Sequence, residues 1–205
     1  MAKFPEPDLE VIRSVPAELV TLRTDRIVWR VYFAQGAHPV SWDTFRRFGP
    51  VAGGRFDHHL PPTSLQRRSV SYLGDSPSVC VAEVFQATRT ISETGEPHLV
   101  GFRLRRPARL LDLRGLWPTA ARGSQAIASG PKARSQRWAR VIAEAYGDVD
   151  GVAYRSSMHA GDDAWCLWGC RDALPDSPDV NESLFHPGLR LPLHRIASTL
   201  GYRVV

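Results

Sequence analysis

The stretch Val70–Arg89 reads VSYLGDSPSVCVAEVFQATR and joins a predicted strand to a predicted helix. Its first four residues alternate between apolar and polar side chains, which predicts a β-strand. The glycine and aspartate that follow end this strand. Asp75 or Ser76 is then placed to cap a helix. Pro77 suits the first helical position, and Val79–Thr88 is expected to continue the helix.

One acidic residue, Glu83, stands inside this otherwise apolar helix. Its sequence neighbours are small or apolar, and the residues three and four positions away carry no charge. A carboxylate without a local ion-pair partner on a mostly buried helix is costly, so it needs a distant partner or a functional role. Two interpretations stay open: Glu83 pairs with one of the many arginines, or it takes part in chemistry.

The composition is that of one globular domain. The chain has 205 residues, of which 43% are hydrophobic and 23% are charged, and these values suit a single domain with a full core. The formal net charge is +5, and Lys3 and Lys132 are the only lysines. Arginine suits the planar recognition of phosphate, which favours nucleic acid, a nucleotide or a phosphate ester as partner. A coding bias toward arginine explains the same composition.

Three cysteines, Cys80, Cys166 and Cys170, provide neither a disulfide framework nor enough ligands for a zinc site. We therefore expect no metal. The first residues lack the apolar segment of a signal peptide, and no run is long and apolar enough to span a membrane. We expect a cytoplasmic protein.

The rest of the sequence predicts an α+β domain. Short turns between the strands expected at 98–104 and 108–113 favour an antiparallel or mixed sheet over repeated strand–helix–strand units. A strand is also expected at Arg26–Phe33, and the clearest amphipathic helix at Arg134–Tyr146. We divide one single domain, residues 1–205, into a helical lead-in at 1–25, a core at 26–170 and a C-terminal extension at 171–205.

Arg30 lies at the centre of its predicted strand, which is an unusual place for a charge. It is either a surface charge at a sheet edge or a cation that reaches into a cleft to hold an anion. Gln35–Pro62 is expected to be irregular, and the two glycines before Arg55 let the backbone lie close to a ligand. His58 and His59 point to opposite sides of an extended segment, so we expect loop histidines rather than metal ligands.

Four motifs, taken in order, resemble the RES-domain family. They are Trp29-Arg30-Val31, Gly54-Arg55-Phe56-Asp57, Tyr72-Leu73 followed by Ala82-Glu83-Val84-Phe85, and Gly151-Val152-Ala153-Tyr154-Arg155-Ser156. The family is named for an arginine, a glutamate and a serine, which fall here on Arg30, Glu83 and Ser156. The resemblance spans roughly residues 26–168. Many relatives have Ser-Arg where this chain has Ser156-Ser157, so a further basic contact is either missing or supplied from elsewhere. Ser157 is the alternative for the family serine.

The resemblance implies a fold and an activity. The fold is similar to the ADP-ribosyltransferase fold of diphtheria-type toxins, a mixed, split β-sheet flanked by helices. Members are mostly toxins of toxin–antitoxin pairs that degrade NAD by cleaving the nicotinamide–ribose bond, through hydrolysis or phosphorolysis. NAD is then a substrate rather than a cofactor, with inorganic phosphate as a co-substrate of phosphorolysis. The alternative is mono-ADP-ribosylation of a protein target.

The resemblance also implies partners. An Xre-like antitoxin is expected to cover the active site, and nucleic acid is expected to be contacted only through that antitoxin complex. No membrane partner is expected.

The matched residues suit these roles chemically. Arg30 and Arg55 can bind the diphosphate through paired, charge-assisted hydrogen bonds. Tyr72 can stack on the nicotinamide ring. An ionised Glu83 would stabilise the positive charge that develops on the ribose, and Ser156 would hold the nicotinamide amide or a phosphate.

Other classes of protein are less consistent with the motifs. No Gly-x-Ser-x-Gly surrounds Ser156, which argues against a hydrolase triad. The chain also lacks a GxGxxG motif, so we do not expect the Rossmann unit on which a dehydrogenase holds NAD. A ribonuclease or nucleic-acid-binding toxin stays open because of the basic charge and the pair His58-His59. A non-catalytic interaction module also stays open, in which Arg30 and Glu83 form a structural ion pair.

Overall fold

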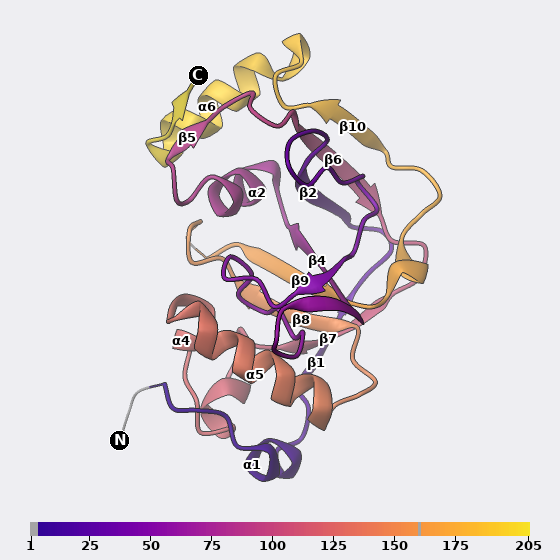
Figure 1. The fold of residues 1–205 in the computed structure, drawn as a ribbon, viewed down its shortest axis with the longest axis vertical. Helices are drawn as coiled ribbons and strands as arrows, with labels where there is room; N and C mark the ends of the chain where they lie inside the picture. Colours follow the sequence, from indigo (N-terminus) through magenta and orange to yellow (C-terminus); the bar gives the residue numbers. More distant parts are fainter. Residues whose placement is uncertain (1–3, 160) are drawn as a thin grey trace.

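The computed structural model describes residues 4–159 and 161–205, which form a strongly twisted sheet with helices on both halves (Figure 1). The strands are β1 (Leu19–Leu22), β2 (Ile27–Phe33), β3 (Arg46–Gly49), β4 (Ser64–Gly74), β5 (Thr90–Ile91), β6 (Pro97–Arg103), β7 (Ala108–Asp112), β8 (Gly151–Arg155), β9 (Asp163–Trp168), β10 (Val180–Ser183) and β11 (Arg203–Val204). The helices are α1 (Leu9–Ser14), α2 (Pro77–Val84), α3 (Trp117–Ala120), α4 (Ala126–Ser129), α5 (Lys132–Ala145) and α6 (Arg190–Leu200), with 3₁₀ turns at Arg171–Ala173 and Pro187–Leu189.

Nine strands form one mixed sheet in the order β1-β7-β8-β9-β4-β2-β6-β10, and β3 pairs with the first part of β4. Neighbouring strands are antiparallel except β7 and β8, which run parallel. β5 and β11 form a separate parallel pair. The predicted α+β class, with a mixed sheet flanked by helices, is confirmed.

The sheet is split between β2 and β4. All residues of β2 pair with β6, but only Trp29 pairs with β4, where it lies opposite Gly74. A side chain is not tolerated at Gly74, because a Cβ there would lie 2.8 Å from the Sγ of Cys80 on α2. The chain therefore turns tightly from β4 into α2, and α2 occupies the centre of the molecule beside the split (Figure 1).

Helices cover the two halves of the sheet separately. α1, α4 and α5 lie along β7, β8 and β9, and their core includes Trp138 and Cys166 (lower half of Figure 1). α2 and α6 cover β2 and β6 around Val81 and Leu193. A third apolar cluster, with Trp165, lies on the other face of the sheet, because successive side chains of β9 alternate between faces.

The expected helical lead-in at 1–25 is wrong in its second half. Leu9–Ser14 is helical and is capped by Asp8, but Leu19–Leu22 forms β1 and pairs with β7. A four-residue segment gains more from a sheet edge with a complete set of partners than from an isolated helical turn.

The expected boundaries of the core, 26–170, are too narrow. β1 precedes this range and β10 follows it, and both belong to the main sheet. The segment expected to be irregular, Gln35–Pro62, also contains β3. Within residues 4–159 and 161–205, no helix has the length and apolar content that crossing a bilayer requires.

Candidate active site

Glu83 and Ser156 meet directly, although they lie on different halves of the molecule. Glu83 is near the end of α2, and Ser156 directly follows β8. The Ser156 hydroxyl donates to Oε1 of Glu83 at 2.6 Å, and Ser156 Oγ accepts the backbone N–H groups of Met158 and His159 at 3.1 and 3.0 Å. Ser156 is buried and Ser157 is exposed, so the structure places Ser156 and not Ser157 against the carboxylate.

The predicted strand, turn and helix hold Glu83 in this place. Ser76 caps α2 by accepting from the N–H of Val79 at 3.3 Å, and Pro77 occupies the first turn. The helix then buries the face that carries Cys80. It ends at Val84, earlier than the expected Thr88. Glu83 is therefore a half-buried acid on a short, well-anchored helix.

Glu83 forms no ion pair with any residue of the described chain. Its second oxygen, Oε2, accepts one long hydrogen bond, from Nε2 of Gln86 at 3.4 Å. The same Nε2 donates to the Glu83 backbone carbonyl at 2.6 Å. The interpretation that Glu83 pairs with an arginine is therefore wrong. Oε1 is held by Ser156, whereas Oε2 has only the long contact with Gln86.

Arg55 lies within electrostatic reach of Glu83 without contacting it. Burial lowers the pKa of Arg55, and the negative charge of Glu83 partly opposes that shift. The guanidinium Nη1 donates to the backbone carbonyl of Gly130 and to Ser135 Oγ, the latter at 3.3 Å. Both acceptors are neutral, so Arg55 is a partly desolvated cation next to a carboxylate.

Two tyrosines line the same region of the sheet. The buried hydroxyl of Tyr72 has no hydrogen-bond partner among the described residues, and a Cβ on Gly54 would lie 2.9 Å from it. Burial raises the pKa of Tyr72 well above its usual value. Tyr154 is buried with its ring 4.6 Å from that of Phe56, and burial followed by the charge of Glu83 raises its pKa in the same way. Both tyrosines are therefore neutral.

Tyr154 is a site residue that sequence reasoning missed. It stands two residues before Ser156 on an extended segment, so both side chains point to the same face of the sheet. That spacing is the signal in the sequence that could have found it.

Arg30 does not join the other residues in direct contact. Its Nη1 donates to the backbone carbonyls of Trp42 and Thr44, both at 2.8 Å. No carboxylate among the described residues forms an ion pair with it, so the structural pair between Arg30 and Glu83 is not formed. Burial lowers the pKa of Arg30 to about 10, which leaves the guanidinium charged at neutral pH. A desolvated cation without an ion-pair partner is energetically costly, and a bound anion would offset that cost.

The histidine pair that favoured a nucleic-acid function is enclosed. His58 is 7% exposed and His59 is fully buried, where it contacts the buried carboxylate of Asp57. Neither ring is presented on the surface for an extended polynucleotide. Across residues 4–159 and 161–205, no three His, Cys, Asp or Glu side chains lie close enough together to hold a metal ion.

Comparison with known proteins identifies a family and a similar fold. A family model, the RES domain, matches residues 27–193. A chain in the crystal structure of the M. tuberculosis MbcT–MbcA toxin–antitoxin complex has a similar fold, with a TM-score of 0.55 and 18% sequence identity. The match covers 91% of this chain and 96% of that chain. Comparison with curated protein sequences gives no significant match.

Proposed function

The chain belongs to the RES-domain family, and from that membership we propose that it is a toxin that cleaves the nicotinamide–ribose bond of NAD. NAD is the substrate that the family resemblance implies. It combines a diphosphate, a ribose and a positively charged nicotinamide, and each part has a matching group among Arg30, Arg55, Tyr72, Glu83 and Ser156.

The hydrogen bond between Ser156 and Glu83 is the observation that carries the proposal. When the bond between ribose C1′ and the nicotinamide nitrogen breaks, nicotinamide leaves with the bonding electrons and positive charge develops on the ribose. A carboxylate fixed beside the ribose stabilises that charge without having to reorganise. The contact with Ser156 fixes Glu83 through Oε1 and leaves Oε2 to face the substrate.

Ser156 acts as a positioning residue in this proposal. Its proton is directed at Glu83 and its oxygen already accepts two backbone N–H groups. A nucleophile would need a free lone pair on that oxygen, and the two N–H groups occupy both of its lone pairs. The arrangement therefore supports a role in orienting the carboxylate.

The two partly desolvated arginines supply binding energy for the diphosphate. Arg30 and Arg55 donate only to neutral acceptors, so each retains N–H groups, and the nearby charges of Asp43 and Glu83 only partly offset their burial. Arginine forms paired, charge-assisted hydrogen bonds with phosphate oxygens. Tyr72 and Tyr154 provide neutral aromatic surface, which suits a cationic nicotinamide ring in the ground state.

The acceptor that attacks C1′ distinguishes the possible reactions. Water loses a proton and gives ADP-ribose, inorganic phosphate gives a phosphorylated ADP-ribose, and a protein side chain gives an ADP-ribosylated protein. We propose hydrolysis or phosphorolysis. The test is incubation of the purified protein with NAD, with and without phosphate, followed by mass spectrometry of the products. Intact NAD under both conditions would contradict the proposal.

We further propose an antitoxin partner. The similar fold in the MbcT–MbcA structure belongs to a toxin–antitoxin complex, and cytoplasmic NAD cleavage would harm the cell that makes the enzyme. The family resemblance implies an Xre-like protein that covers Arg30, Arg55 and Glu83. Co-purification with the product of a neighbouring gene, with loss of NAD cleavage in the complex, tests this proposal. Full activity of the complex would contradict it.

A further inference from the structure

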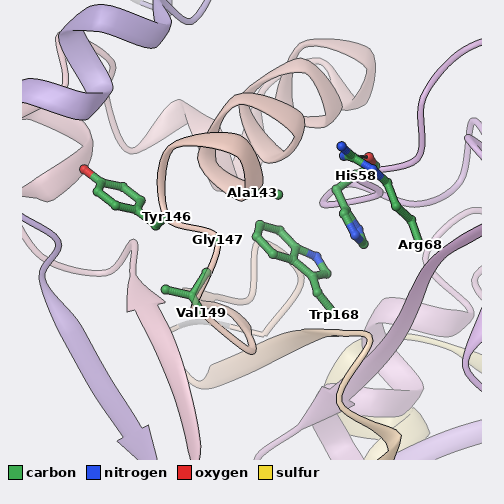
Figure 2. Close-up of a pocket in the computed structure, with 7 residues that line it drawn as sticks. All are labelled: His58, Arg68, Ala143, Tyr146, Gly147, Val149 and Trp168. Atoms are coloured by element: carbon green, nitrogen blue, oxygen red, sulfur yellow. Dashed lines mark hydrogen bonds between the residues drawn. The ribbon is translucent and has the colours of Figure 1, made fainter.

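A second site lies at the far end of β9 from Ser156. A hollow of about 250 Å³ is bounded there by the end of α5, by β4 and by β9 (Figure 2). Its lining residues are His58, Arg68, Ala143, Tyr146, Gly147, Val149 and Trp168. Asp163, at the start of β9, pairs with the residue before Ser156. Five residue steps along β9 separate Asp163 from Trp168, so the hollow is about 17 Å from Ser156, whereas Tyr72 lies opposite Cys166, two residues from Trp168.

The hollow contains a cation that no carboxylate neutralises. Arg68 donates from Nη1 to the backbone carbonyl of His58 at 2.7 Å, and the described residues give it no ion-pair partner. Arg140 on α5 lies nearby, 3.4 Å from the carbonyl of His59. Burial and the positive charges around it lower the pKa of Arg140. Arg68 lines the hollow, and Arg140 lies close enough to Arg68 for the two charges to repel each other.

The acid next to His58 in the sequence, Asp57, is already paired with another arginine. Asp57 is fully buried and accepts from Nη2 of Arg46 at 2.7 Å and from the N–H of Val51 at 2.9 Å. Its other oxygen contacts His59. The negative end of α5 also faces the hollow, but a helix end carries only about half a charge. Among the described residues that line the hollow, Arg68 carries the one formal charge, and it is positive.

His58 presents a polar atom that lacks a partner. Its ring is stacked on Trp168, with centroids 4.9 Å apart and planes at 29°, and it lies between Trp168 and Arg68 in Figure 2. The residue is 7% exposed, and its Nδ1 is buried without a hydrogen-bond partner in the described chain. Burial and Arg68 hold His58 neutral, so one ring nitrogen donates and the other accepts. This nitrogen therefore lacks the partner that a buried polar atom normally has.

We propose that this hollow binds a small oxyanion, a phosphate or a carboxylate, through the guanidinium of Arg68 and the imidazole of His58. Arg68 supplies the charge and its remaining N–H groups. His58 supplies a directed hydrogen bond, and Trp168, Val149 and Ala143 form a wall that shields both contacts from water. None of the residues that line the hollow is assigned to the proposed NAD site, so the proposal goes beyond the proposed function.

Nuclear magnetic resonance of the ¹⁵N-labelled imidazole of His58 tests the proposal at the site itself. The signal is assigned with His58→Gln. Inorganic phosphate and acetate are titrated separately into the full chain at constant ionic strength with chloride. Either anion is expected to shift the His58 signal in a saturable way, and the anion that does so at the lower concentration identifies the source of the ligand.

Matched variants separate a built site from general positive charge. Arg68→Gln is expected to weaken the response at least about tenfold, which corresponds to the loss of one charge-assisted contact. Arg67→Gln removes an exposed arginine from the preceding position of β4 and is expected to respond like the wild type. NAD loss is expected to be the same in both variants and in the wild type.

A second variant leaves both ligand-binding side chains in place. Ala143→Glu puts a carboxylate on the α5 wall of the hollow and is expected to abolish the response by occupying Arg68. Equal responses of Arg68→Gln and Arg67→Gln, no His58 shift into the millimolar range, or a wild-type response in Ala143→Glu would each overturn the proposal.

Discussion

Ser156 Oγ lies 2.6 Å from Oε1 of Glu83, across 73 positions of sequence. The contact joins the end of β8 in one half of the sheet to α2 beside the split. A half-buried carboxylate without a cationic partner is held there by one hydroxyl, and that hydroxyl is itself fixed by two backbone N–H groups. This relationship sets which oxygen of Glu83 can face a substrate, so it is the first to be tested.

Ser156→Ala removes the contact and leaves the N–H groups of Met158 and His159 without their acceptor. We expect the free energy of unfolding to fall by about 1–3 kcal/mol. NAD cleavage is expected to fall on the order of a hundredfold, because the carboxylate loses its orientation. Ser157→Ala is the control and is expected to change neither quantity. Equal NAD cleavage in the two variants would refute the positioning role of Ser156.

Arg30→Gln removes a desolvated cation that has no carboxylate partner in the described chain. NAD affinity is expected to fall by about tenfold to a hundredfold, the equivalent of one charge-assisted interaction. Titration calorimetry in a Glu83→Gln background measures binding without turnover. Arg47→Gln is the control, since Arg47 is exposed on β3 and donates to the carbonyl of Gln66. Equal affinities of the two variants would show that Arg30 does not bind the diphosphate.

His58 makes stability depend on pH in a defined direction. Burial, followed by the charge of Arg68, lowers its pKa from 6.5 to about 3. As the pH falls below 6.5, His58 becomes protonated in the unfolded chain but stays neutral in the folded chain. The contribution of His58 to the free energy of unfolding is therefore fully present above pH 6.5. Between pH 6.5 and 3 the free energy of unfolding falls by up to about 1.4 kcal/mol per pH unit.

Urea denaturation at several values between pH 7 and pH 4.5 measures this effect. In His58→Gln the decline is expected to be flatter than in the wild type, because the glutamine does not titrate. Two parallel curves would show that His58 titrates equally in the folded and unfolded chains.

Gly151 begins β8 where no side chain fits. Its φ is +146°, and a Cβ would lie 2.0 Å from the carbonyl oxygen of Cys166 on β9. Gly151→Ala is expected to disrupt the pairing that leads to Ser156 and to destabilise the fold by about 3 kcal/mol or more. Gly53→Ala, with no atom within 4 Å of its Cβ, is expected to stay within about 0.5 kcal/mol. Thermal unfolding of both variants compares them, and similar melting temperatures would contradict this account of β8.

The strand, turn and helix around Glu83 could be predicted from the sequence because every local signal agrees. The alternation before Gly74, the cap at Ser76 and Pro77 at the helix start all specify the same local structure. The same holds for α5, where the buried face carries Trp138 and Ile142. Such elements depend on residues that are close in sequence.

The features that the sequence did not reveal depend on distant partners. β1 is a strand because β7 offers a free edge, and β3 forms because β4 extends back to Ser64. The contact of Ser156 with Glu83 requires the strand order β8-β9-β4, which no local pattern specifies. The separate environment of Arg30 follows from the split between β2 and β4.

NAD consumption by the wild type and by Glu83→Gln is the decisive comparison. Glu93→Gln, which alters an exposed acid of a loop, serves as the matched control. All three proteins are expected to unfold at similar temperatures, and wild type and Glu93→Gln are expected to release nicotinamide at equal rates. Glu83→Gln is expected to be slower on the order of a thousandfold, because it lacks the charge that stabilises the ribose cation. Nicotinamide release by Glu83→Gln at the wild-type rate would contradict the assignment of this site.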